Sequence, residues 1–350
     1  MSKKKQKKSS KAAVLLLAAA VIAAGYFAFD YYSTYLRANS VGSAKPINIY
    51  RATDYQGLLD SIEASGAVSN MKTFRKVARQ QKLSESFKPG HYELKGGLNN
   101  KEIERVFSHG WQTPVRLLIK PGIRDLGKLC ATLGRQMEAD SSEFAAALAD
   151  RQVMEGHGFR PATYLAMFIP DTYEVYWTST PFQLLERMKK EYDAFWTDAR
   201  RAKARDIGLS RDQVVTLASI VIEETKYEPE MPTVAGVYMN RLHKGMLLQA
   251  DPTVKYAVND PSLRRILNVH LQVDSPYNTY KHPGLPPGPI TIPTKNAIDA
   301  VLGYEHHNYL YFCAHENMNG QHRFAETYAK HLENARRFHS ALTAMQKAKL

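Results

Sequence analysis

Two adjacent glutamates near the end of a predicted helix have the chemistry of a general acid. The helix is predicted over residues 212–226, where apolar side chains recur with a helical period. Because successive helical residues are 100° apart, Glu224 falls on the flank of the apolar face, between Leu217 and Ile220. A carboxyl held against apolar side chains loses solvation in its charged form, so its pKa rises toward neutrality. The alternative is a rim glutamate on an ordinary buried helix.

Glu223 is the second candidate for such an acid. On the same helical wheel it falls on the opposite, polar side of the helix, together with Thr216 and Ser219. The predicted helix therefore favours Glu224 as the acid and leaves Glu223 as the runner-up.

Two loops further along the chain are stiff and rich in hydrogen-bonding side chains. They span residues 275–280 (SPYNTY) and 284–290 (GLPPGPI). Such runs cannot form regular secondary structure, because proline fixes φ and lacks a backbone N–H. Tyr and Asn at fixed positions suit a ligand covered in hydroxyl and acetamide groups. A structural loop at the edge of a domain is an equally good interpretation.

The N-terminal end of the chain has the pattern of a membrane anchor. The 350 residues carry a net charge of +13, and six lysines precede residue 12. Residues 12–29 are all apolar or small, and tyrosines follow in 31–36, which is long enough to span a bilayer. Because lysine clusters stay cytoplasmic, we predict a basic cytoplasmic tail at 1–11 and a single-pass inner-membrane anchor at 12–36. The remainder, long enough for two domains, would then be periplasmic or extracytoplasmic.

A cleaved signal peptide is the alternative to an anchor. Its apolar region would be shorter, and a small-x-small site would follow it. The segments Ala38-Asn39-Ser40 and Gly42-Ser43-Ala44 provide such sites. In either case the lysines set the topology, so we predict no nucleic-acid partner.

No cofactor or metal is predicted. Cys130 and Cys313 are too few for a disulfide framework, and their apolar contexts favour burial over a bridge. The histidines are scattered, and the sequence has no CxxC or HExxH motif, so a metal site is not expected.

The residues beyond the anchor divide by pattern into a linker, a small module and a larger helical region. A short polar linker is predicted at 37–46 and an α+β module at 47–120. The module has an extended segment at 47–50, helices at 55–65, 70–80 and 100–108, and a strand at 115–119. Helices dominate residues 121–350, with early ones predicted at 124–137, 141–150 and 181–205. Tyr173, Tyr176 and Trp177 lie in an extended segment and are either core residues or platforms for sugar rings.

Four long motifs occur in order between residues 217 and 324. They are LASIVIEET at 217–225, VAGVYMNRLHKGMLLQADPTVKYAV at 234–258, SPYNTYKHPGLPPGPITIP at 275–293 and HNYLYFCAHENMNGQHRF at 307–324. With these motifs the chain resembles the MltG/YceG-like family of endolytic murein (peptidoglycan) transglycosylases. Weaker similarity extends back to Ile47.

The resemblance implies a fold and an activity. The fold would be α+β: one transmembrane helix, a LysM-like module, and a mainly helical, lysozyme-like catalytic domain at 121–350. The activity would be cleavage of the MurNAc–GlcNAc bond within peptidoglycan glycan strands, leaving 1,6-anhydroMurNAc ends. One glutamate would serve as general acid and base. Peptidoglycan synthases or division proteins are partners expected at the level of the family.

The family's catalytic glutamate matches Glu224, directly before Thr225, which is the carboxyl that the helical wheel also favours. Many relatives carry another glutamate where this chain has Ile222, so that position cannot supply the acid here. Asp251 is the nearest second carboxylate, or else a turn residue before proline. Motif positions expected to contact substrate are Asn240, Gln249, Asp251, Ser275, Tyr277, Asn278 and Tyr280.

Two further motif residues are not assigned to the substrate. Arg241 is expected to hold the fold through a salt bridge or a helix-end contact. His322 also matches a family position, and its role is open.

Two other activities are compatible with the same sequence. A muramidase would hydrolyse the same bond with water, and its product would be one water heavier than an anhydro end. A non-catalytic cell-wall-binding scaffold would bind through 47–120 and release nothing. The glutamate within the motif argues against the scaffold.

Overall fold

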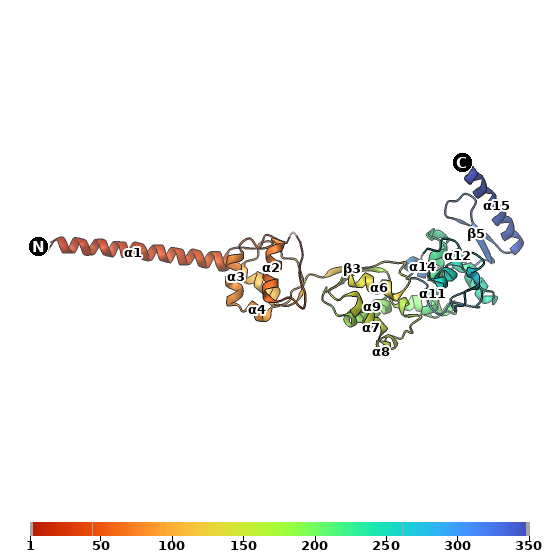
Figure 1. Cartoon of the computed structure of the whole chain (residues 1–350), viewed down its shortest axis with the longest axis horizontal. Coiled ribbons are helices and arrows are strands. Elements are labelled where there is room, and N and C mark those ends of the chain that lie inside the picture. Colours follow the sequence, from red (N-terminus) through yellow and green to blue (C-terminus); the bar gives the residue numbers. More distant parts are fainter. Residues whose placement is uncertain (1–2, 44, 261, 348–350) are drawn as a thin grey trace. The chain divides into compact units, whose positions relative to one another are not determined.

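The structure is a computed structural model that describes residues 3–43, 45–260 and 262–347. It is mostly helical with short two-stranded sheets, which confirms the predicted mixed, mainly helical α+β class. The chain divides into two compact units, Met1–Arg116 with Glu174–Ser179, and Leu117–Tyr173 with Thr180–Leu350 (Figure 1). The LysM-like and lysozyme-like assignments stay predictions. Residues 1–2 of the predicted tail, Ala44 of the alternative cleavage site and residues 348–350 lie outside the described ranges.

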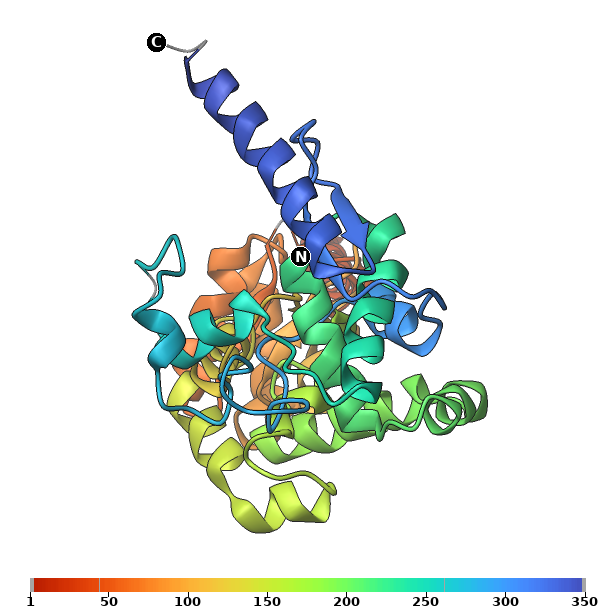
Figure 2. The same ribbon diagram turned by 90° about the vertical axis from the view of Figure 1, so that its right-hand side faces the viewer.

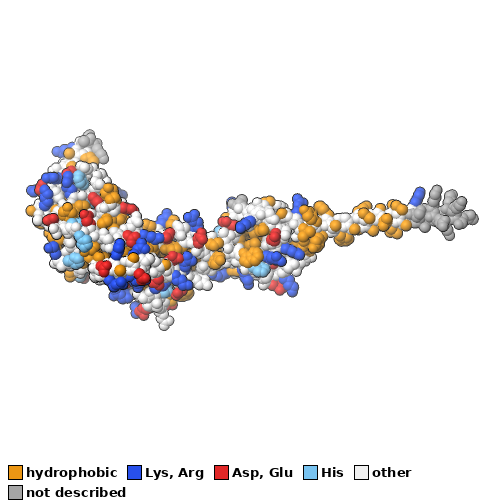
Figure 3. All heavy atoms as spheres, turned by 180° about the vertical axis from the view of Figure 1, so that it is seen from behind, with side chains coloured by type: hydrophobic (Ala, Val, Ile, Leu, Met, Phe, Trp, Pro, Cys, Tyr) orange, Lys and Arg blue, Asp and Glu red, His pale blue; other side chains and the backbone are white. Residues whose placement is uncertain are grey.

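The N-terminal helix exposes its apolar side chains. Helix α1 (Lys3–Tyr31) continues into a π-helical turn, η1 (Tyr32–Leu36). Leu16 and Ile22 are each 72% exposed, and Figure 3 shows hydrophobic atoms along the coloured length of the helix. Lys11–Leu36 is long and apolar enough to cross a membrane. This is consistent with the predicted anchor at 12–36, and a signal sequence would have the same character.

The first unit is built from short, capped helices around one antiparallel strand pair. Its elements after η1 are β1 (Ile47–Ile49), α2 (Tyr55–Ser65), α3 (Met71–Gln80), α4 (Leu83–Ser86), β2 (Gly90–Tyr92) and α5 (Asn100–Ser108). Strand β1 pairs with β2, with Ile47 opposite Tyr92. Asp54, Asn70 and Asn99 each accept a backbone N–H at a helix start, as polar N-cap residues do. These local signals explain why the predicted helices form here.

The predicted linker at 37–46 is fastened to this first unit. Asn39 is buried, and its Nδ2 donates to Asn70 O at 3.0 Å and to Asn100 Oδ1 at 2.6 Å. Asn100 Nδ2 in turn donates to the carbonyl oxygen of Thr34 at 2.9 Å, at the end of the apolar helix. Hydrogen bonds of the Asn39 and Asn100 amides therefore hold this segment on the first unit.

The aromatic segment before α9 supplies mainly core residues. Tyr173 and Trp177 are buried, and the Trp177 ring packs edge-on against Tyr50 with centroids 4.8 Å apart. Tyr176 is 56% exposed. Of the three suggested sugar platforms, only Tyr176 has a ring open to solvent.

After α5 the chain forms a strand pair and a series of helices. The elements are β3 (Val115–Ile119), α6 (Leu126–Gly134), α7 (Ser141–Ala149), α8 (Arg151–Gly156), η2 (Tyr164–Met167), β4 (Asp171–Val175), α9 (Pro181–Phe195) and α10 (Asp198–Asp206). Strands β3 and β4 pair with each other. The prediction of a single helix over 181–205 is wrong, because α9 ends at Phe195 and α10 begins at Asp198. Between them, Trp196 has non-helical φ −80° and ψ 69° and a fully buried ring, and Thr197 caps α10 by accepting the Arg200 N–H.

Helix α11 (Arg211–Glu224) lies in the middle of the second unit. It packs against α12 (Met231–His243) and α14 (Lys295–Leu302). The predicted polar side of α11 is wrong, because Thr216 and Ser219 are both buried. Ser219 Oγ donates to Thr216 O at 2.6 Å and accepts the Ile290 N–H at 3.0 Å, so its hydroxyl is satisfied inside the core.

The C-terminal part of the second unit forms an arm. After η3 (Glu228–Glu230), α13 (Asp251–Val258) and η4 (His270–Gln272), strands β5 (Tyr311–Ala314) and β6 (His322–Ala325) pair antiparallel. Helix α15 (Tyr328–Lys347) packs on this hairpin. Figures 1 and 2 both show α15 extending away from the rest of the second unit.

Candidate active site

Glu224 is the last residue of α11, and its half-buried side chain lines a cavity of about 300 Å³. Tyr238 Oη, on α12, donates a hydrogen bond to Glu224 Oε1 at 2.7 Å. Burial raises the pKa of Glu224 to about 7, against the lowering effect of the Tyr238 hydrogen bond, and the negative charge of Asp251 adds to the rise. A carboxyl with this pKa is substantially protonated at neutral pH, as a general acid must be.

Glu223 has a different environment from its neighbour. Its carboxylate forms an ion pair with Arg124, and Lys226 Nζ lies 3.9 Å from its Oε1. Glu223 thus bonds to cations, whereas Glu224 bonds to a neutral phenol. This contrast favours Glu224 as the proton donor.

Arg241 lies one turn after Tyr238 on α12 and lines the same cavity. Its guanidinium is buried and donates to carbonyl oxygens: Nε to Leu310 at 2.7 Å and Nη1 to Leu248 at 2.7 Å. Within the described ranges no carboxylate lies within 4 Å of it. A salt bridge or a helix-end contact was predicted for Arg241, and the structure has the second, near the end of α12. The bond to Leu310 joins α12 to the chain before β5.

Three of the predicted site residues share the Glu224 cavity: Gln249, Asp251 and Tyr280. Tyr280 Oη donates to Asp251 Oδ1 at 2.6 Å, so Asp251 accepts from a phenol and does not cap its own helix α13. Gln249 has φ +51°, a left-handed conformation that is costly for a non-glycine residue. Such strain is often found where the fold must present a side chain to a ligand.

Two predicted contact residues use their side-chain amides to hold neighbouring loops. Asn278 is completely buried; its Nδ2 donates to Leu271 O and Val273 O, both at 2.9 Å, and its Oδ1 accepts the Tyr280 N–H at 3.0 Å. Asn240 Nδ2 donates to His307 O at 2.7 Å and Tyr309 O at 3.0 Å. The amide of Asn278 is therefore occupied at both ends, and direct substrate contact is not supported for it. Within the described residues the hydrogen bonds of the Asn240 side chain use only its Nδ2, so its Oδ1 is left open to a ligand.

Ser275 and Tyr277 are not brought to the Glu224 cavity. They line a separate cavity of about 500 Å³, together with Lys128 and Lys255. The ring of Tyr277 packs against Tyr256 with centroids 4.7 Å apart. Contact from these residues would require a ligand that extends beyond the immediate surroundings of Glu224.

Glu224 also lines two further cavities. One, of about 400 Å³, is bounded by the β5–β6 hairpin through His315 and His322. The other, of about 500 Å³, is bounded by Lys255, Arg264 and Arg265. A carboxyl at the meeting point of several openings suits a linear ligand that passes through the site and is attacked within its length.

The sequence did not indicate the wall that faces Glu224. Tyr311 and Phe312 of β5 and Tyr328 and His331 of α15 line the 300 Å³ cavity. The run of large apolar and aromatic residues at 309–312 is typical of a strand, but nothing local to it indicates proximity to Glu224. Nothing in the sequence indicated either that Tyr238, which lies 14 positions after Glu224 on the next helix, would bond to it.

The chain is similar to known proteins along most of its length. A sequence model of the YceG-like family matches residues 47–337. A relative named endolytic murein transglycosylase from Bacillus subtilis (strain 168) is 26% identical over 310 residues, covering 81% of this chain and 82% of the relative. One of the same name from Streptococcus pneumoniae (strain ATCC BAA-255 / R6) is 26% identical over 330 residues, covering 83% of this chain but 58% of the relative. A crystal structure of a YceG-like protein from Listeria monocytogenes superposes with a TM-score of 0.55 at 25% identity, covering 83% of this chain and 98% of that chain.

Proposed function

The chain belongs to the YceG-like family, and we propose from this premise that it is a membrane-anchored endolytic murein transglycosylase. Its relatives' shared name supports the reaction class. The observation that carries the proposal for this chain is the half-buried carboxyl of Glu224, with a pKa of about 7, on a ligand-sized cavity.

In the first step Glu224 acts as the acid. Its Oε1 accepts from Tyr238, so the transferable proton belongs on Oε2. That proton passes to the glycosidic oxygen between MurNAc and GlcNAc, and the C1–O bond of MurNAc breaks. The sugar left behind has oxocarbenium character, and the negative charge of Asp251 on the same cavity wall would stabilise it.

In the second step Glu224 acts as the base. Its carboxylate takes the proton from the C6 hydroxyl of the same MurNAc, whose oxygen bonds to C1 and forms the 1,6-anhydro ring. Glu224 thereby returns to its protonated state, so the cycle balances without an attacking water. One titrating carboxyl is enough for both steps.

The decisive experiment compares the two neighbouring glutamates. Glu224→Gln keeps the shape of the side chain and removes the acid, so release of anhydroMurNAc products from purified sacculi should stop. Glu223→Gln is the matched control and should retain activity, because Glu223 is occupied by Arg124. Undiminished release by Glu224→Gln would refute the assignment, and so would loss of release in Glu223→Gln alone.

Hydrolysis by water is the second candidate, and the position of Asp251 favours it. Asp251 lines the same cavity as Glu224 and could activate a water molecule for attack on C1. Mass spectrometry of the released fragments separates the reactions, because the hydrolysed end is one water heavier. A non-catalytic wall-binding scaffold would release no fragments at all.

We also propose that Lys11–Leu36 anchors the chain in the inner membrane, with the lysine-rich tail in the cytoplasm and the chain beyond Leu36 outside it. The test is fractionation of cells that express the chain, followed by protease treatment of spheroplasts. An anchored chain should stay with the membrane and lose its C-terminal units to the protease. Release into the soluble fraction with loss of residues before 45 would favour the signal peptide instead.

A further inference from the structure

The cavity on the hairpin side of Glu224 contains a histidine with no role in the mechanism above. This cavity of about 400 Å³ falls within the size range of small-molecule sites. Its wall includes His322 of β6, with Met318 and Phe338 as apolar neighbours. Glu224 lies on the same wall, so a ligand held here would lie beside the reacting bond.

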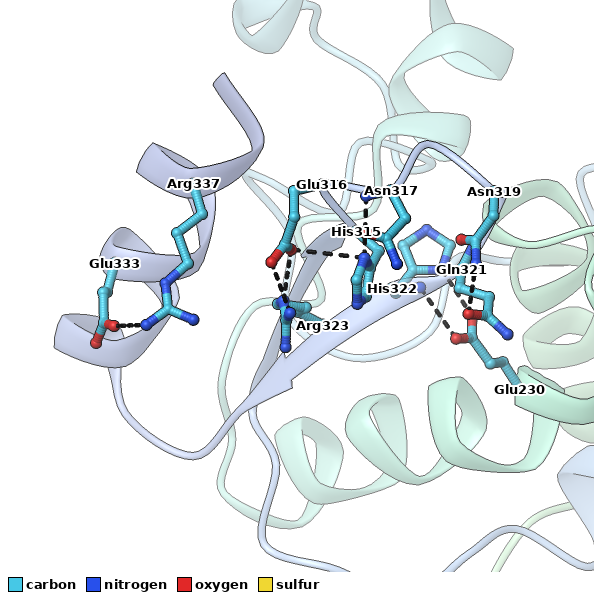
Figure 4. Close-up of polar contacts among 10 residues, drawn as sticks. All are labelled: Glu230, His315, Glu316, Asn317, Asn319, Gln321, His322, Arg323, Glu333 and Arg337. Atoms are coloured by element: carbon cyan, nitrogen blue, oxygen red, sulfur yellow. Dashed lines mark hydrogen bonds and ion pairs between the residues drawn. The ribbon is translucent and has the colours of Figure 1, made fainter. Parts of the chain in front are cut away.

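A single carboxylate fixes the position of His322. Glu230 Oε1 accepts the backbone N–H of His322 at 3.0 Å, and Glu230 Oε2 lies 3.0 Å from the ring Nδ1. Both side chains are only 14% exposed. Phe312 packs edge-on against the ring, with centroids 5.4 Å apart. Figure 4 shows the Glu230 carboxylate beside His322, and Glu230 belongs to η3, which connects α11 to α12.

These contacts fix which ring nitrogen carries the proton. Both oxygens of the Glu230 carboxylate are acceptors, so Nδ1 must be the donor in the neutral ring. Nε2 then has a free lone pair, and ring geometry points it away from Glu230. In the described part of the chain nothing bonds to Nε2. Besides the Glu224 carboxyl, the cavity therefore has an oriented acceptor beside two apolar side chains.

We infer that this acceptor binds the acetamide group of a glycan residue next to the bond that Glu224 cleaves. The acetamide N–H would donate to His322 Nε2, and its methyl group would pack on Met318 and Phe338. Glu230 is a positioning residue, because it sets the tautomer of His322 without touching the ligand. The inference rests on the proposed function, since it takes N-acetylated glycan as the substrate.

A purely structural role is the competing explanation. In that case Glu230 and His322 only tie the α11–α12 connection to the hairpin, and Nε2 does nothing. The two roles use different ring nitrogens: Nδ1 makes the tie, and Nε2 would bind the ligand. Substitutions that keep one nitrogen position and remove the other can separate them.

The test uses His322→Asn and His322→Gln. Asn places its amide near Nδ1 and keeps the contact with Glu230, whereas Gln reaches the position of Nε2 and loses that contact. Both are made in full-length Glu224→Gln protein in detergent, so the ligand stays intact, and binding of chitotetraose is measured by calorimetry. We expect His322→Asn to weaken binding about five- to tenfold, the typical effect of losing one hydrogen bond. His322→Gln should retain most of the binding. Equal binding by His322→Asn and its parent, or the reverse order of the two variants, would overturn the inference.

Two further arms test the tautomer and the acetamide. Glu230→Gln can still accept the His322 backbone N–H through its oxygen, but its amide would donate to Nδ1 and turn Nε2 into a donor. It should therefore weaken binding of chitotetraose and not of the de-N-acetylated tetramer, a difference that a structural tie would not produce. A Glu224→Gln parent that binds both tetramers equally, or neither, would overturn the subsite. Continued cleavage of sacculi by Glu224→Gln would instead overturn the catalytic role of Glu224 in the proposed function.

Discussion

Tyr238 and Glu224 are joined by a 2.7 Å hydrogen bond between the phenol Oη and carboxyl Oε1, which connects α12 to the end of α11. Tyr238 is buried, so the bond is shielded from water. A neutral donor orients the carboxyl without supplying a full positive charge. Burial can therefore dominate and raise the pKa of Glu224 to about 7, despite the lowering effect of this bond.

Tyr238→Phe should move the pH dependence of cleavage upward. The reaction needs protonated Glu224, so the rate falls as pH rises through its pKa of about 7. The Tyr238 hydrogen bond lowers that pKa, so removing the hydroxyl raises it further and shifts the alkaline limb to higher pH. Initial rates of fragment release between pH 5 and 9 measure the shift. Tyr256→Phe, in the separate cavity, is the control and should leave the limb in place. If the alkaline limb does not move in Tyr238→Phe, its assignment to the titration of Glu224 is contradicted.

Asp251→Asn should shift the same limb in the opposite direction. The negative charge of Asp251 raises the pKa of Glu224, so neutralising it lowers that pKa and moves the alkaline limb to lower pH. Asn can still accept the Tyr280 hydroxyl at Oδ1, so the local geometry should survive. Exposed Asp274→Asn provides the control for loss of one negative charge. A limb that moves upward, or moves equally in both variants, would argue against the coupling.

Glu224→Gln should stabilise the protein in a pH-dependent way. The pKa of Glu224 is raised from its ordinary 4.5 to about 7 in the folded state, so the unfolded chain gives up this proton first as pH rises. Wild-type stability therefore falls between those pH values and is constant above them. A rise of this size corresponds to about 3 kcal/mol. The difference in free energy of unfolding between variant and wild type should be larger at pH 8 than at pH 5 in urea titrations. A difference that does not depend on pH would show that the carboxyl is not desolvated by folding.

Local signals in the sequence predicted much of this fold. The helix predicted at 100–108 forms in the structure, where Asn99 directly before it accepts the N–H groups of Lys101 and Glu102. The strand at 115–119 and the helix at 55–65 also have their predicted bounds. Glu224 was selected by helical periodicity, and in the structure it lines a cavity with a raised pKa. These features depend on neighbours a few residues away, which a sequence pattern records.

Features set by distant contacts could not be predicted in this way. Helix α9 ends before Trp196, whose ring is fully buried, and a helical pattern through 181–205 does not reveal that burial. Ser219 reads as polar in sequence, yet Ile290, 71 positions later, satisfies its hydroxyl in the core. Asn278 looked like a ligand contact because its type suits one, but its amide is used entirely by the loop. Side-chain type alone does not tell which partner a polar group finds.

Gly288→Ala should destabilise the second unit and weaken activity. A Cβ at position 288 would lie 1.7 Å from the carbonyl oxygen of Ala162, and backbone cannot rotate away. The loop would have to shift, at a cost of about 1–3 kcal/mol in the free energy of unfolding. Ile290, two residues on, bonds to Ser219 of α11, so the displacement would reach the helix that carries Glu224. Gly156→Ala is the matched control, because nothing lies within 4 Å of a Cβ there, and a helical alanine should be neutral or stabilising. Urea unfolding and sacculus cleavage measure both variants, and equal behaviour of the two would show that this close approach does not constrain the loop.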